Sequence, residues 1–363
     1  MAFGLFKKKQ DKVPEVKTGF LNLKVKDVIH ETADAVSIHF EHPDDRRVEY
    51  KSGQFLTVIV DVNGKEERRA YSLCTSPHVD DNPAVTVKRV DGGIVSNYLN
   101  DHVKAGDTMK LMEPNGNFVT TIDSNQTRHV VLLGGGSGIT PLMSLAKSIL
   151  DQESNSKVTL VYANRNVESI IFKEGLKEME SNDNFNVVHI LETPNAEVSS
   201  HEGYLTQEII KEVLDNLGEE ASEFFICGPT PMMDVAISSL EALGIASSKI
   251  RKESFVSTAS EKKEETADSD ELIAREVTII YDGEEYKYTV EPDETILEKG
   301  LDEDVDLPFS CQSGLCTACR GKCLSGKVKM DEDEGLSEAE LDEGYVLPCV
   351  GHPLTDDVVI EIG

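Results

Sequence analysis

Four cysteines in the last part of the chain have the spacing of cluster ligands. Cys311, Cys316 and Cys319 follow the pattern C-x4-C-x2-C, and Cys349 follows later in YVLPCVGHP. This is the plant-type [2Fe–2S] pattern, in which four thiolates hold two irons. Zinc also accepts four thiolates, but zinc sites usually pair two CxxC units, and here the fourth cysteine stands alone. We therefore expect a [2Fe–2S] cluster, with Cys323 as a structural thiol outside the ligand set.

A glycine-rich turn is the second candidate site. The segment LGGGSGITP follows an apolar run and precedes a helical one, so its glycines would let the backbone approach a pyrophosphate closely and its proline suits a first helical turn. The residues concerned are Gly134, Gly136, Gly138, Thr140 and Pro141. Cys227, Gly228 and Pro229 end a later strand, which is where a parallel sheet binds ligands. Together the two turns predict a nucleotide site.

A third group of residues stands upstream, around an R-x-Y-S motif. It comprises Arg69, Tyr71, Ser72 and Leu73 after a predicted strand. The segment GGIVSNYL follows, with Gly93 and Ser96 at the start of a predicted helix, whose free N–H groups and dipole favour a phosphate. The motif alone is weak evidence, and the helix start at this distance gives it meaning.

The elements that must position these residues fall into three folded regions and a linker. Short alternating runs such as FLTVIVDV predict an antiparallel β-barrel. Apolar strands that alternate with helical stretches predict a doubly wound α/β domain. A hairpin across Asp282-Gly283 begins a smaller α+β domain. The polar segment STASEKKEETADSDELIA separates the last two as a solvated linker. We expect the boundaries at 18–124, 125–257, 258–273 (the linker) and 274–363.

Composition excludes several classes of protein. The 363 residues include 67 acidic and 36 basic ones, and the net charge of −31 argues against a nucleic-acid partner. No apolar run approaches the roughly 20 residues that cross a bilayer, and the first ten residues do not resemble a secretory signal. Seven cysteines, an odd number with four gathered together, favour metal ligation in a reducing cytoplasm over a disulfide framework.

Two family resemblances follow from these motifs. The final ninety residues resemble plant-type ferredoxins of β-grasp fold, including the hairpin, the helix before the cysteines and the late L-P-C-V segment. The region before the linker resembles the ferredoxin–NADP reductase superfamily. That resemblance implies FAD, with Arg69 and Ser96 at its pyrophosphate, Tyr71 against the isoalloxazine and Ser72 at the reactive flavin edge.

The same resemblance implies a nicotinamide site. Thr140 and the Cys227–Pro229 turn would flank the nicotinamide; the alternative for Cys227 is an inert buried thiol at the end of a strand. Arg165 stands where the family holds the adenosine ribose; with no acidic residue at this strand tip, it favours NADPH over NADH, and the alternative is an ordinary surface arginine. Glu253 and Phe255 resemble the closing E-x-F at the flavin edge. Reductases of plants end at this aromatic residue, whereas this chain continues.

The domain order resembles reductase components of phenylacetyl-CoA epoxidase and of steroid-ring monooxygenases. A nicotinamide gives up two electrons at once and a [2Fe–2S] cluster accepts one, so a flavin must stand between them. We therefore expect an NAD(P)H-dependent oxidoreductase supplying a separate oxygenase, with phenylacetyl-CoA epoxidase favoured. The alternatives are a reductase of a hybrid-cluster protein or other acceptor, and a non-enzymatic electron carrier with a vestigial flavin half.

Overall fold

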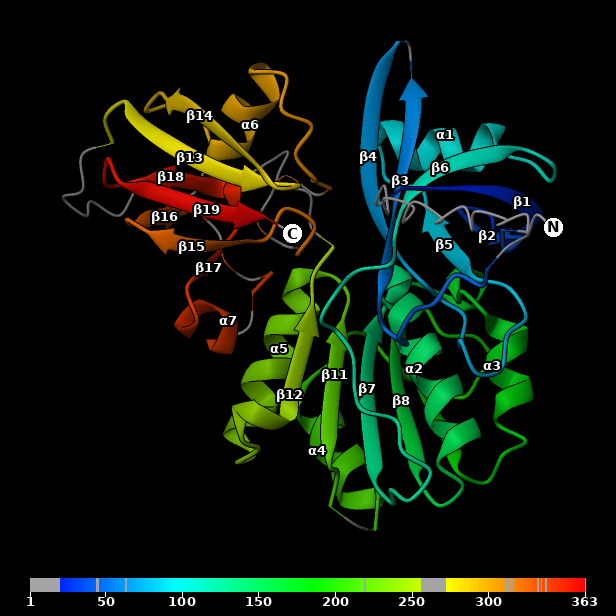
Figure 1. Cartoon of the computed structure of the whole chain (residues 1–363). Helices are drawn as coiled ribbons and strands as arrows, with labels where there is room; N and C mark the ends of the chain where they lie inside the picture. The colour runs from blue at the N-terminus through cyan, green and yellow to red at the C-terminus, as the bar shows by residue number, and fades with distance from the viewer. Residues whose placement is uncertain are drawn as a thin grey trace, which may run out of the picture.

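The computed structural model describes residues 20–43, 46–62, 64–218, 220–255, 272–310, 312, 314, 316–331, 333, 335–336 and 338–362. They form three units: a β-barrel, an α/β unit below it, and a carboxyl-terminal unit beside the barrel (Figure 1). Most of the predicted linker, residues 258–271, lies outside the described residues.

The barrel is an antiparallel six-stranded sheet in the order β4-β3-β6-β1-β2-β5. Its elements are β1 (Phe20–Thr32), β2 (Ala35–Phe40), β3 (Phe55–Val62), β4 (Lys65–Ser72), β5 (Ala84–Lys88), β6 (Thr108–Met112) and helix α1 (Ile94–His102). A bridge between Leu73 and Val85 joins the two edges of the sheet. In the first part of β1, buried Leu21, Leu23 and Val25 alternate with exposed residues, so one face of the strand fills the barrel.

The α/β unit is a parallel six-stranded sheet in the order β10-β9-β8-β7-β11-β12. Its strands are β7 (His129–Gly135), β8 (Lys157–Asn164), β9 (Phe185–Leu191), β10 (Ser200–Glu202), β11 (Glu223–Cys227) and β12 (Ile250–Glu253). Its helices are α2 (Ile139–Gln152), α3 (Lys173–Met179), α4 (Gln207–Asn216) and α5 (Thr230–Ala242).

Successive residues of β7 face opposite layers of this unit. Val130 and Leu132 pack in a core with α2 and α3, whereas Val131 and Leu133 pack in a second core with α4 and α5. Both faces of the sheet are therefore covered by helices. The strand order reverses between β7 and β11, so the carboxyl ends of these two strands form the crevice where open sheets bind ligands.

The carboxyl-terminal unit has a mixed five-stranded sheet in the order β14-β13-β19-β15-β17 and a small β16-β18 pair. Its elements are β13 (Arg275–Tyr281), β14 (Glu284–Val290), α6 (Ile296–Asp302), β15 (Gly321–Ser325), β16 (Val328–Met330), α7 (Glu338–Asp342), β17 (Tyr345–Val346), β18 (Gly351–Pro353) and β19 (Val358–Ile362). The predicted hairpin is present, with positive φ at Asp282 (51°) and Gly283 (80°). The predicted fold class, a β-barrel, a doubly wound α/β domain and an α+β domain, is confirmed.

In the described part of the chain, no helix combines the length and the apolar character needed to cross a membrane.

Candidate active site

The candidate active site begins where β7, β11 and β12 end together. In the strand register Cys227 lies opposite Gly134 on one side and Glu253 on the other, so the three residues stand at one level of the sheet. The turn after β7 packs directly on this level, since a Cβ added at Gly138 would lie 2.1 Å from the carbonyl oxygen of Cys227. The glycine at 138 is therefore required by close packing between the two predicted turns.

A hydrogen bond joins this edge of the sheet to the barrel. The Ser72 hydroxyl, at the end of β4, donates to Oε2 of Glu253 across 3.1 Å. Burial raises the pKa of Glu253 from 4.5 to about 8, and the hydrogen bond from Ser72 opposes part of that rise. Burial also raises the pKa of the Cys227 thiol well above its ordinary value, and the nearby Glu253 adds to this effect. At neutral pH the site thus holds a largely protonated carboxyl and a neutral thiol.

The glycine-rich turn is held by its own neighbours. Gly136 has a φ of 53°, and its carbonyl accepts a hydrogen bond of 2.9 Å from the Tyr162 hydroxyl. The Thr140 hydroxyl donates to the Ser137 carbonyl at 3.1 Å. A Cβ at Gly228 would lie 2.9 Å from the backbone nitrogen of Gly135, so the two turns touch backbone to backbone. Leu73, Pro141 and Gly134 are buried, and Pro229 begins α5 as its N-cap.

On the barrel side, β4 places Arg69 and Tyr71 before Ser72. Arg69 is partly exposed; its Nη1 donates to the Arg68 carbonyl at 2.6 Å and lies 3.3 Å from Oε2 of Glu67. Tyr71 packs against the barrel core, and burial raises its pKa. A guanidinium on the same face of the strand as a partly buried aromatic ring provides a charge for a pyrophosphate beside an apolar wall for a flat ring.

Within the described part of the chain, no side chain caps the start of helix α1. Gly93 is the N-cap residue, and a Cβ there would lie 2.6 Å from the Ser96 hydroxyl oxygen. That hydroxyl accepts a hydrogen bond of 3.1 Å from the Val90 backbone nitrogen, so it holds the turn that precedes the helix. A phosphate here would be bound by backbone N–H groups, with Ser96 shaping the turn.

The end of β8 offers an orphaned polar group that suits a nucleotide. The Asn164 side chain is buried, and neither its amide nitrogen nor its amide oxygen has a hydrogen-bond partner within the described residues. A buried amide without partners is costly, and a bound ligand is one way to satisfy it. The neighbouring Arg165 is 67% exposed and lies 3.7 Å from Oδ2 of Asp34 on the barrel. Phe255 is 42% exposed, just before the undescribed segment.

The predicted cluster ligands lie in the carboxyl-terminal unit. Cys319 and Cys349 are buried in its core and Cys316 is half-buried, while Cys311 lies outside the described residues. Among the described side chains, Cys316, Cys319 and Cys349 included, no three potential metal ligands form a group that could hold a metal ion. The buried hydroxyl of Ser310 has no partner among the described residues and precedes Cys311 directly, a suitable position for a donor to a cluster sulfur.

Cys323 lies apart, on β15. Its thiol donates to the Ser325 carbonyl at 3.2 Å. This local contact supports its exclusion from the ligand set.

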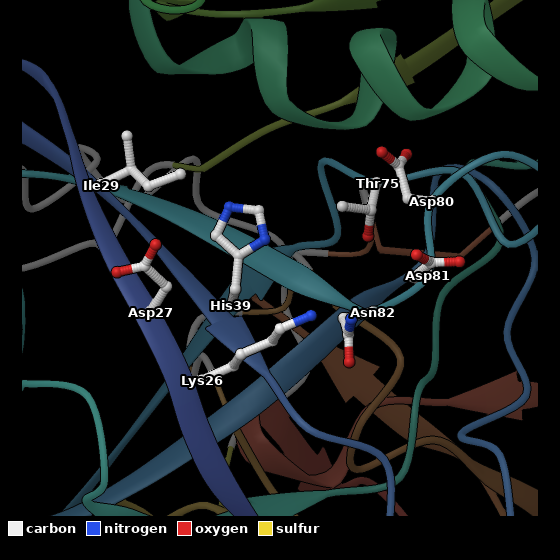
Figure 2. Close-up of a pocket in the computed structure, with 8 residues that line it drawn as sticks. All are labelled: Lys26, Asp27, Ile29, His39, Thr75, Asp80, Asp81 and Asn82. Carbon is white, nitrogen blue, oxygen red and sulfur yellow. The ribbon is translucent and has the colours of Figure 1, made fainter.

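A polar pocket of about 230 Å³ lies elsewhere on the barrel, between β1, β2 and the segment after β4 (Figure 2). It is lined by Lys26, Asp27, Ile29, His39, Thr75, Asp80, Asp81 and Asn82. None of the residues predicted from the motifs lines it. Burial lowers the pKa of His39, although the nearby carboxylates of Asp27, Glu31 and Asp80 oppose this. The pocket is therefore separate from the candidate active site.

Three family descriptions match successive parts of the chain. They are the oxidoreductase FAD-binding domain over residues 21–120, the oxidoreductase NAD-binding domain over 132–237, and the 2Fe-2S iron-sulfur cluster binding domain over 279–354. With the two turns, the Ser72–Glu253 contact and the late cysteines, these matches define an oxidoreductase of the ferredoxin reductase type, with FAD-, NAD- and [2Fe–2S]-binding domains.

Curated relatives define the family more narrowly. The chain is 37% identical to the ferredoxin reductase component of 3-ketosteroid-9-alpha-monooxygenase from Rhodococcus rhodochrous, over 93% of this chain and 96% of the relative. It is 34% identical to one of the subunits of 1,2-phenylacetyl-CoA epoxidase from Escherichia coli, over 95% of this chain and 98% of that relative. The chain belongs to this family of electron-transfer reductase components of oxygenases.

Solved structures agree on the fold. The chain matches phthalate dioxygenase reductase with a TM-score of 0.60 and 24% identity, over 95% of this chain and 98% of that one. It also matches an intact type IV self-sufficient cytochrome P450 monooxygenase with a TM-score of 0.71 and 20% identity, over 98% of this chain and 43% of that one.

Proposed function

We propose that the chain oxidises NADPH at the level of Ser72, Cys227 and Glu253 and delivers the electrons, through FAD and its own [2Fe–2S] cluster, to a separate oxygenase. The observation that carries this proposal is the Ser72–Glu253 hydrogen bond, which joins the end of a barrel strand to the ligand-binding edge of the parallel sheet. When bound, the flavin takes the electron pair of a hydride and releases it one electron at a time, as a [2Fe–2S] cluster requires.

The protein's own groups have distinct proposed roles. The Glu253 carboxyl keeps a proton beside the Ser72 hydroxyl at neutral pH, because its pKa is about 8. The neutral Cys227 thiol forms an uncharged wall for the nicotinamide, and Thr140 and Pro229 bound that wall on either side. Arg69 and the start of α1 at Gly93 hold the pyrophosphate of FAD. Cys311, Cys316, Cys319 and Cys349 hold the cluster.

NADPH is the proposed donor because of Arg165. Its guanidinium is 67% exposed at the end of β8, next to the buried amide of Asn164. A guanidinium binds a phosphate with two parallel hydrogen bonds, which a ribose hydroxyl cannot accept in the same way. Oδ2 of Asp34 lies 3.7 Å from Nη2 of Arg165, and this ion pair would have to break for Arg165 to bind the 2′-phosphate.

Phenylacetyl-CoA epoxidase remains the favoured acceptor, and the 3-ketosteroid-9-alpha-monooxygenase system is the second candidate. Each is supported by a relative aligned over more than nine-tenths of this chain, at 34% and 37% identity. We place the reaction in the cytoplasm, where a reducing environment keeps cluster thiolates available.

Reconstitution tests this proposal. The full-length holoprotein is mixed with NADPH and the oxygenase component of either system, and the oxygenated product is measured. Cys349→Ser should abolish product formation while leaving NADPH-dependent reduction of ferricyanide. Cys323→Ser is the matched control and should retain both. Product formation that survives in Cys349→Ser would show that electrons leave from the flavin. Failure of the wild-type protein to reduce ferricyanide would overturn the reductase proposal itself.

A further inference from the structure

Strand β4 carries different groups on its two faces. Side chains alternate along a strand, so Arg69 and Tyr71 share one face while Glu66 and Arg68 share the other. The side chain of Arg68 is only 6% exposed, which is unusual for a charged residue on a strand at the edge of its sheet. In Figure 1, β4 is the edge of the barrel that faces the carboxyl-terminal unit. The second face of β4, with Glu66 and Arg68, therefore lies at the contact between the barrel and the carboxyl-terminal unit, which we call the inter-domain seam.

The guanidinium of Arg68 contacts one aromatic ring and one carboxylate in each of the two units. Within the barrel, its guanidinium lies 6.0 Å from the ring of Phe20 and donates two hydrogen bonds, of 2.8 and 2.9 Å, to Oε1 of Glu66. From the carboxyl-terminal unit, the ring of Phe309 lies 4.3 Å away and Oδ1 of Asp306 lies at 3.5 Å. A desolvated cation between two rings is strongly attracted to their faces. This single side chain thus links the two units.

A second contact of the seam involves residues 316–319, which include the second and third predicted cluster cysteines and are called the cluster loop below. Thr317, between the second and third cluster cysteines, is 6% exposed, and its hydroxyl donates to Oδ1 of Asn115 on the barrel across 3.3 Å. Asn115 in turn exchanges two backbone hydrogen bonds, of 2.9 and 3.0 Å, with Phe55. Phe55 is the register partner of Ser72. The cluster loop is therefore connected to the proposed hydride site through two residues of the barrel.

A third contact extends the same seam. The Asn117 amide donates to Oε1 of Glu340 at 2.8 Å, and Glu340 forms an ion pair with Arg320 beside the cluster loop. Asn115 and Asn117 belong to one barrel segment, so this segment follows the cluster loop on one side of the seam. Arg68 is thus the buried cation that the two units share, whereas Asn115 and Asn117 contribute hydrogen bonds from uncharged side chains.

We propose that Arg68 is a positioning residue that docks the carboxyl-terminal unit on the barrel and so sets the approach of the cluster loop to the flavin-binding end of β4. Strand β4 then serves both half-reactions: Arg69 and Tyr71 face the flavin, and Arg68 faces the unit that accepts the electrons. This proposal rests on the proposed route of electrons. The competing interpretation is that Arg68 stabilises the barrel alone through Glu66 and Phe20.

The test compares two cations on the same face of the barrel. Arg68→Gln removes the charge shared by the two units. Lys110→Gln is the matched control, because Lys110 also lies near Glu66 (3.3 Å) and Phe20 (4.8 Å), yet both of these partners belong to the barrel. Docking is measured by small-angle X-ray scattering of the full-length holoprotein and by hydrogen exchange of the segments around Asn115 and Thr317. Stopped-flow absorbance follows flavin reduction and cluster reduction separately.

In Arg68→Gln we expect a larger radius of gyration, faster exchange at both segments and cluster reduction about tenfold slower, which corresponds to about 1.4 kcal/mol. Flavin content and the rate of flavin reduction by NADPH should match those of the wild type. Lys110→Gln should behave as wild type in every measurement. Phe309→Leu should give a defect of the same kind from the other side of the seam, and the double variant should be no worse than Arg68→Gln alone, because that change already removes the Arg68–Phe309 contact.

Three outcomes would overturn the proposal. They are wild-type scattering and exchange in Arg68→Gln, strictly additive defects in the double variant, and a loss of FAD that accounts for the slower cluster reduction. The scattering and exchange measurements need no turnover. A failure of NADPH to reduce the flavin in the wild type would therefore refute the proposed function while these measurements still decided the docking role.

Discussion

Replacing Glu253 with glutamine should change how the stability of the protein depends on pH. The Glu253 side chain is half-buried beside Cys227, and its pKa is raised from 4.5 to about 8, chiefly by burial. Below pH 4.5 the carboxyl is protonated in both the folded and the unfolded chain, so its contribution to stability is fully present. Between pH 4.5 and 8 the unfolded chain releases the proton and the folded chain retains it, so stability falls as the pH rises.

The size of this effect follows from the two pKa values. Each pH unit between them is worth about 1.4 kcal/mol, so the full loss across the window is about 5 kcal/mol. Glutamine has the same shape and no proton to release. The free energy of unfolding of Glu253→Gln, relative to that of the wild type, should therefore rise by about 3 kcal/mol between pH 5.5 and 7.5. At roughly 2–4 °C per kcal/mol this is a relative gain of about 6–12 °C in melting temperature.

Differential scanning calorimetry of both proteins at several pH values measures this gain, and the difference between them cancels every other titrating group. Glu241→Gln, an exposed position on α5, is the control for losing one negative charge and should show no pH-dependent difference. Ser72→Ala should widen the window toward higher pH, because the hydroxyl that stabilises the ionised carboxylate is gone. A melting-temperature difference between Glu253→Gln and the wild type that stays constant from pH 5.5 to 7.5 would refute the reasoning.

Three further predictions concern the electron route. Cys349→Ser should abolish the absorption of the cluster and leave FAD bound, whereas Cys323→Ser should leave the visible spectrum unchanged; a cluster lost in the latter would mean that the ligand set is wrong. Arg165→Ala should lower the ratio of kcat/KM for NADPH over NADH by about tenfold or more, since a charge-assisted hydrogen bond is worth roughly 1.5–3 kcal/mol, and an unmoved ratio in steady-state kinetics would reject the assignment. A chain ending near Thr258 should reduce ferricyanide but reduce cytochrome c poorly. Residues 271–363 carry 24 acidic and 7 basic residues, so the rate at which the full chain reduces a basic partner should fall as ionic strength rises. If the short and full chains reduce cytochrome c at equal rates, the proposed order of electron transfer is wrong.

Local sequence patterns were sufficient to predict those features that depend on a single short segment of the chain. The spacing of Cys316 and Cys319 and the Asp282-Gly283 turn are properties of short stretches of chain, and they could be read before any contact was known. The doubly wound sheet could also be predicted, because strands buried on both faces are apolar throughout. The Ser96 hydroxyl accepts a hydrogen bond from the Val90 backbone nitrogen, a contact that no local signal in the sequence reveals. A hydroxyl that accepts one hydrogen bond can still donate its proton, so the role of Ser96 at the FAD pyrophosphate stays a prediction.

The sequence by itself determined the three domains, their order and the residue types of each cofactor site, because glycines, cysteines and strand periodicity act within a few residues. Only the tertiary structure decided how those sites meet. Ser72 and Glu253 are 181 positions apart, and their hydrogen bond depends on how the barrel packs on the parallel sheet. Arg68 looks like a duplicate of Arg69 in the sequence. It became the link between two units because a strand turns adjacent side chains to opposite faces, and because distant Phe309 and Asp306 cover one of them.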